Sequence, residues 1–236
     1  MKRNLIVAAA AGLAIVVLMG VAAYVYFFSG LRTSPARLAL SAPSTSSPQQ
    51  TTTGLAGTWK VTTGSLAGYR VQELFVGETS KHLAVARTSD VSGGLTVVGD
   101  ASGYQVSSIT LTVDLTSLHS VDQVAGRNVS QRDGVVTRQL ETQQIPFATF
   151  TAATASVPGS VTSSPADVTL LGKLTIHGVT KDVTATAHAQ VVGDKIQVAG
   201  TLTINMADYG VSPPRAPFVT VDPTVTIEFA VFLTRS

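Results

Sequence analysis

Apolar and polar residues alternate along most of the region from residue 54 to residue 236, and this pattern constrains the fold more than any other feature of the chain. Successive side chains of an extended strand point to opposite faces, so a period of two predicts strands with one buried face. The clearest alternating runs cover residues 109–115, 173–177, 183–191, 196–204 and 225–233, and glycines lie between several of them. We therefore predict eight to ten antiparallel strands, mostly in meander order, that form a barrel or a sandwich.

The predicted inner face of these strands carries no charge in the alternating runs. This face includes three small side chains on a single strand, namely Ala185, Ala187 and Ala189. These alanines either face bulky side chains in a solid core or leave space for a ligand. Without further information, the residues favour the solid core.

The alternation breaks between about residue 119 and residue 143, where the apolar spacing indicates a short helix or irregular structure across one end of the fold. This segment contains a group of charges, Arg127, Arg132, Asp133 and Arg138. They could pair with one another or cap the segment, or they could contact a lipid headgroup. The sequence favours pairing.

The N-terminal region carries a run of apolar residues from 5 to 28, after a basic start at residues 1–4. As a helix, 24 residues would span about 36 Å, which exceeds a hydrocarbon core of about 30 Å. A cleaved signal peptide is the alternative, but its apolar region is usually only about 7–15 residues long and ends in a small-residue cleavage site. We therefore predict an uncleaved, single-pass anchor in the cell membrane, with the N-terminus inside and the following domain outside the cytoplasm.

Residues 29–53 are rich in Ser, Thr, Pro and Gln, and such composition buries too little apolar surface to offset its ordering entropy. We predict that residues 29–53 form a flexible linker without a fold, and that residues 54–236 form the folded domain.

Several classes of function are disfavoured by what the chain lacks. The formal net charge of +2 comes from the N-terminal region, because residues 54–236 carry 12 basic and 14 acidic side chains, so we expect no nucleic-acid partner. The chain has no cysteine, and its four histidines lack metal-ligand spacing. No nucleophile elbow or phosphate-binding glycine motif is present. We expect no catalytic residue, no metal and no cofactor, and hence no enzyme.

Several segments of the predicted domain are similar to one known family. Gly172 followed by Leu174-Thr-Ile-His-Gly-Val-Thr-Lys181 and Asp182-Val183 closely resembles the signature of the YceI-like family. Arg132-Asp133 with the later run 145–150, Ile-Pro-Phe-Ala-Thr-Phe, resembles a second segment of that family. Residues 57–59 and 65–71 resemble its opening strands in the actinobacterial branch. The resemblance covers about residues 57–235.

The resemblance implies an extended, lipocalin-like antiparallel β-barrel of about eight strands in a protein of the cell envelope, with a long isoprenoid chain inside the barrel. It reverses the preference for a solid core. We thus expect a membrane-anchored binding protein for a long isoprenoid or similar apolar lipid; the alternative is a structural or interaction module of the envelope with a filled barrel. The expected lining residues are Tyr69, Val71, Phe75, Ile109, Leu111, Val113, Phe150, Leu174, Ile176, Ala185, Ala187, Ala189, Val198, Leu202, Ile204, Ile227 and Phe229.

Overall fold

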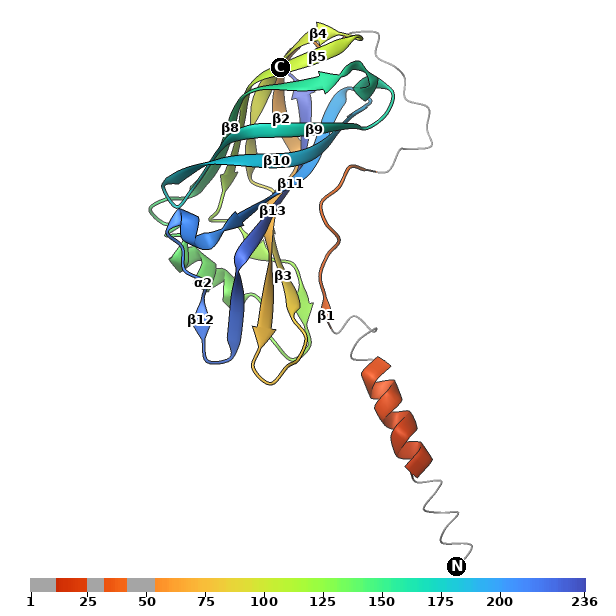
Figure 1. The fold of residues 1–236 in the computed structure, drawn as a ribbon, viewed down its shortest axis with the longest axis vertical. Coiled ribbons are helices and arrows are strands. Elements are labelled where there is room, and N and C mark those ends of the chain that lie inside the picture. The colour runs from red at the N-terminus through yellow and green to blue at the C-terminus, as the bar shows by residue number, and fades with distance from the viewer. Residues whose placement is uncertain (1–11, 25–31, 42–53) are drawn as a thin grey trace, which may run out of the picture.

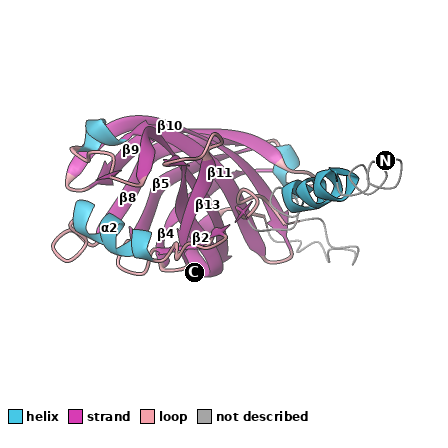
Figure 2. Cartoon of the chain, turned by 90° about the horizontal axis from the view of Figure 1, so that it is seen from below, coloured by secondary structure: helices cyan, strands magenta, loops and turns pink. Residues whose placement is uncertain are grey.

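The computed structural model describes residues 12–24, 32–41 and 54–236. Within these ranges, eight antiparallel strands close into a barrel, because the first long strand pairs with the last (Figure 1). Figure 2 looks at this barrel from the end where the helix α2 (Gln131–Gln139) lies. In order around the barrel, its strands are β2 (Gly57–Phe75), β4 (Val91–Asp100), β5 (Gly103–Asp114), β8 (Phe147–Pro158), β9 (Ala166–Ile176), β10 (Val179–Val192), β11 (Lys195–Asn205) and β13 (Val219–Arg235). The predicted all-β barrel of about eight strands is confirmed.

Short elements cover the sides and ends of the barrel. β3 (His82–Thr88) pairs with β2 beyond the point where β2 leaves β4, and β12 (Arg215–Ala216) pairs with β13. The segment predicted to interrupt the strands contains β6 (His119–Ser120), β7 (Gln123–Val124) and α2. Two single-turn helices complete the fold, η1 (Gly159–Thr162) and η2 (Met206–Tyr209).

The most family-like motif forms the hairpin between β9 and β10. Ile176 pairs with Val179, so His177 and Gly178 are the two turn residues. Their φ angles are +51° and +73°, which is the left-handed geometry that a two-residue turn requires to match the twist of the strands. His177 Nδ1 also lies 3.2 Å from the carbonyl oxygen of Tyr209, so the hairpin helps to hold η2 in place.

Residues 32–41, which we call the strap, lie along the outside of the barrel and are fixed to it. β1 (Arg32–Thr33) pairs with β7, and the backbone N–H of Leu38 donates to the Glu228 carboxylate at 3.1 Å. At the far end of the strap, the N–H of Ser41 donates to Gln197 at 3.0 Å. The prediction that residues 29–53 have no fold is therefore wrong for residues 32–41. Residues 29–31 and 42–53 lie outside the described residues.

Beneath the strap lies a group of three charged side chains, Arg70, Arg87 and Glu228, which we call the strap cluster. Arg70 Nε and Arg87 Nε donate to the two oxygens of Glu228 at 2.7 and 2.9 Å. The two guanidinium groups also donate to the strap carbonyls of Pro35 and Ala36. These contacts use backbone groups of the strap, so its amino-acid composition gave no sign of structure.

Residues 12–24 form a helix with exposed side chains. Within the described ranges, no helix is both long and apolar enough to cross a bilayer. Residues 5–11 and 25–28 of the predicted anchor lie outside the described residues, as does the N-terminal segment 1–4.

Candidate functional site

The interior of the barrel is a cavity with a volume of about 270 Å³. A single buried water needs only roughly 10–15 Å³ of such space, so the barrel is hollow rather than filled by its own side chains. The cavity runs from Leu55 and Val161 near one end to Val211 and Val221 near the other. The cavity therefore extends along the barrel, and its elongated shape suits an extended chain molecule.

Nearly all of the predicted lining residues face this cavity, because the inward phase of each strand follows from its alternation. They are Tyr69, Val71, Ile109, Leu111, Val113, Phe150, Leu174, Ile176, Ala185, Ala189, Val198, Leu202, Ile204, Ile227 and Phe229. Within the wall, large side chains lie beside small ones. The ring of Phe150, for example, lies against Gly172, where an added Cβ would come within 2.6 Å of it.

The prediction is wrong for Phe75 and Ala187, which do not line the cavity. Phe75 is at the end of β2, beyond the barrel proper, where its ring lies 4.0 Å below the Arg127 guanidinium. Ala187 is buried opposite Gly200, where an added Cβ would come within 2.7 Å of the ring tip of Phe229 and within 2.8 Å of the Ala187 Cβ. Phe229 therefore forms the wall at the point where Ala187 was expected to do so.

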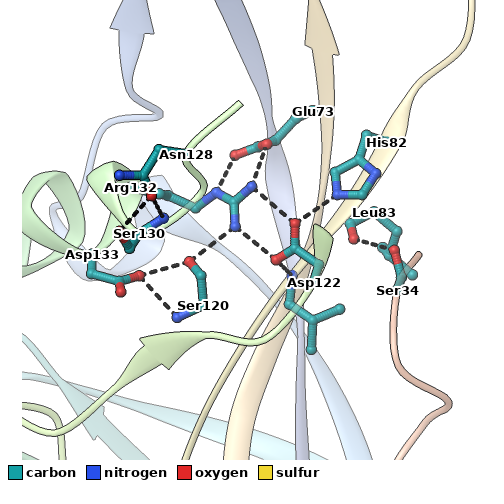
Figure 3. A network of polar contacts seen from close by, with 11 residues as sticks. Ser34, Glu73, His82, Leu83, Ser120, Asp122, Asn128, Ser130, Arg132 and Asp133 are labelled. Carbon is teal, nitrogen blue, oxygen red and sulfur yellow. Dashed lines mark hydrogen bonds and ion pairs between the residues drawn. The ribbon is translucent and has the colours of Figure 1, made fainter. Parts of the chain in front are cut away.

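The polar side chains that line the cavity include Glu73 from β2 and Arg132 and Gln139 from α2. Glu73 and Arg132 belong to a group with His82 and Asp122, which we call the cavity-end cluster (Figure 3). Arg132 Nε and Nη2 donate to the two oxygens of Glu73 at 2.8 and 2.9 Å, and Arg132 Nη1 donates to Asp122 at 2.8 Å. His82 Nε2 lies 2.7 Å from the other oxygen of Asp122.

The cavity-end cluster is largely buried, and hydrogen bonds within it stabilise the charged forms of Asp122 and Arg132. Burial alone would raise the pKa of Asp122, but hydrogen bonds from His82, Arg132 and the N–H of Val85 outweigh it and lower the pKa to about 2. Burial would lower the pKa of Arg132, but its bonds to Asp122 and Glu73 hold it above the ordinary value. Burial raises the pKa of the Tyr69 hydroxyl, which also lines the cavity.

Of the charges singled out in the sequence, Arg132 forms ion pairs, although one of its partners, Glu73, lies on a distant strand. Asp133 accepts hydrogen bonds from the N–H and hydroxyl of Ser120 at 2.9 and 2.6 Å. Together these contacts attach α2 to the end of the barrel, where Val136 and Leu140 close the cavity wall. Glu73, His82 and Asp122 were missed because each is an isolated residue in the sequence.

In the part of the chain that the structure describes, no group of three or more His, Asp or Glu side chains is positioned to bind a metal ion. The cavity wall can instead bind by contact with apolar groups. Its chemistry is that of a site for an apolar chain, with ionic groups confined to the end at α2.

Comparison with known proteins supports this architecture. A protein of Pseudomonas putida, UPF0312, is 30% identical over 135 residues, which cover 55% of this chain and 65% of that protein. A UPF0312 protein of Shewanella baltica is 28% identical over 139 residues, covering 56% of this chain and 66% of that protein. The chain thus matches just under two thirds of the length of these relatives.

Among solved structures, a polyisoprenoid-binding domain from Saccharophagus degradans has the same fold. It superimposes with a TM-score of 0.51 at 20% sequence identity, covering 77% of this chain and 99% of that domain. Residues 59–233, which include all the barrel strands apart from their outermost residues, match the YceI-like domain. The chain is a member of the YceI-like family.

Proposed function

We propose that this protein is a binding protein that holds one long apolar lipid of the isoprenoid type inside its barrel, without a catalytic step. The observation that carries the proposal is the hollow, apolar cavity that runs along the barrel. The description of the Saccharophagus degradans domain as polyisoprenoid-binding supports the choice of lipid class. The filled barrel of a purely structural module is disfavoured by the same cavity.

The length of the bound chain dominates the affinity in this proposal. Burying one five-carbon isoprene unit contributes on the order of 4 kcal/mol, at about 0.8 kcal/mol per carbon. Association itself costs about 4–15 kcal/mol, so one or two units would bind weakly and several units tightly. We expect selection by chain length more than by headgroup.

We further propose that the apolar run 5–28 holds the protein in the cell membrane, with the N-terminus inside and the barrel outside the cytoplasm. The length of the run, its basic start and its aromatic end support this arrangement. Such an anchor would keep a lipid-binding barrel close to its ligand, because the ligand resides in the bilayer.

The test is mass spectrometry of a solvent extract from the full chain, purified from its native host. We expect an isoprenoid-type lipid at about one molecule per protein, because a continuous cavity runs along the barrel that the described residues form. A protein that carries no apolar lipid, from cells that contain such lipids, would favour the structural module instead.

A further inference from the structure

We infer that two neighbouring hairpin tips at the α2 end of the barrel, which carry Val76 and Phe218, dock onto the surface of the lipid bilayer. The inference rests on the proposed anchor and adds to it a fixed orientation of the barrel. It depends on three observations: the strap, the short distance from the apolar run to the strap, and the exposed apolar side chains at the tips.

The strap fixes the point at which the chain joins the barrel. Arg32, its first residue, forms an ion pair with Glu78 and donates to the hydroxyl of Ser80 at 3.2 Å. Glu78 and Ser80 belong to the turn between β2 and β3, the same turn that carries Val76. The Ser34 hydroxyl then donates to the Leu83 carbonyl at 2.6 Å. The chain therefore meets the barrel at the β2–β3 tip.

The distance from the apolar run to this tip is short. The run ends at residue 28, and four steps along the chain reach Arg32, a distance of at most about 14 Å. The polar layer of one bilayer leaflet is roughly 5–8 Å thick. If residue 28 lies at the edge of the hydrocarbon, the β2–β3 tip cannot be far from the headgroups.

The tips expose apolar side chains where this geometry brings them to the membrane. Val76 is 67% exposed and Phe218 is 57% exposed. The N–H of Val76 donates to the carbonyl of Phe218 at 3.0 Å, so the two tips form one surface (Figure 1, lower end of the barrel). Exposing two adjacent apolar side chains to water is unfavourable, whereas burying them in the interfacial region of a bilayer is favourable.

Among the described side chains, two pairs of opposite charges lie beside the tips. Lys81 contacts Asp222 at 2.7 Å, and Arg127 lies 3.7 Å from Glu78. Docking therefore needs neither anionic lipids nor the burial of an unpaired charge at these positions. Two apolar residues suffice, because the anchor makes the contact intramolecular and gives it a high effective concentration.

The orientation has a consequence for the ligand. The α2 end of the cavity, closed by Val136 and Leu140, lies on the side of the barrel that faces the bilayer. An apolar lipid would then pass between membrane and cavity without crossing bulk water.

The absence of cysteine allows a direct test with the full chain. Single-cysteine variants Val76→Cys, Phe218→Cys, Leu18→Cys and Asp194→Cys are labelled with an environment-sensitive fluorophore and reconstituted into phosphatidylcholine vesicles that contain a spin-labelled phosphatidylcholine as quencher. Leu18 reports on the anchor. Asp194 is the control for the opposite end, because its neighbour Lys195 pairs with Thr234, about 50 Å of strand from the start of β13.

We expect the labels at positions 18, 76 and 218 to lose most of their fluorescence to the quencher and the label at 194 to keep it. Quenching at 18 without quenching at 76 and 218 would overturn the docking while leaving the anchor intact. No quenching at 18 would overturn the anchor and the docking together. Equal quenching at 194 and at the tips would also contradict a fixed orientation.

A second experiment tests whether the apolar side chains cause the docking. The label is placed at Thr79→Cys in the same turn, with or without Val76→Ser and Phe218→Ser. The paired substitutions should at least halve the quenching at position 79, since both replaced side chains are exposed and the fold does not depend on them. Unchanged quenching would show that the tether alone holds the barrel there and would contradict a role for the tips.

Discussion

The cavity wall and the two ion clusters are all shielded from solvent, but they are built in different ways. The wall consists of interchangeable apolar side chains, each placed by its position along a strand. The cavity-end cluster and the strap cluster consist of charges that need specific partners at specific distances. In general, an apolar wall tolerates changes that keep volume and polarity, whereas a buried ion cluster depends on specific partners and fixes the position of the elements that meet in it.

The largest effect should come from breaking the cavity-end cluster. Arg132→Ala leaves the Glu73 and Asp122 carboxylates buried without their cation, and this should lower the free energy of unfolding by about 3–5 kcal/mol. Arg138→Ala is the matched control on the same helix, because Arg138 is exposed, and it should change stability by less than about 0.5 kcal/mol. Denaturant unfolding of both variants measures the difference. Similar stability of the two variants would show that the cluster does not attach α2.

Acid should weaken the same cluster by a smaller amount. Because the folded pKa of Asp122 is lowered to about 2 from an ordinary 3.8, its contribution is present above pH 4 and is lost as the pH falls toward 2. The loss should be about 2 kcal/mol, at 1.36 kcal/mol per pH unit. Asp122→Asn should remove this part of the pH dependence. If the variant and the original protein lose stability in parallel over this range, the depressed pKa is wrong.

The strap should contribute the smallest of the three effects. Ser34→Ala removes the hydrogen bond to the Leu83 carbonyl and should cost about 1 kcal/mol. Thr33→Ala, at an exposed neighbouring position, should cost less than about 0.5 kcal/mol. Denaturant unfolding of both variants measures the difference. Equal values would mean that the strap does not stabilise the barrel.

The sequence predicted the wall and missed the clusters for a physical reason. Alternation is a local property, so Ile109, Leu111 and Val113 reveal their inward phase without knowledge of their neighbours. The prediction failed at Phe75, where the alternation of β2 continues although the barrel has ended.

Ion clusters depend on contacts between distant parts of the chain. Arg132 and Glu73 are 59 residues apart, and Arg70 and Glu228 are 158 residues apart. Nothing in the neighbourhood of any one of these residues signals its partner. The strap adds a second difficulty, because several of its contacts use backbone N–H and carbonyl groups that every residue possesses.

The most direct test of the central claim is to fill the cavity from one strand and measure the lipid content. Ala185 points into the cavity, whereas its neighbour Thr186 is exposed on the outside of β10. Ala185→Trp and Thr186→Trp are purified from the native host, checked for cooperative unfolding, and extracted for mass spectrometry. We expect the Thr186 variant to retain about one isoprenoid-type lipid per protein and the folded Ala185 variant to retain almost none. Equal lipid content in the two folded variants would contradict binding inside the barrel.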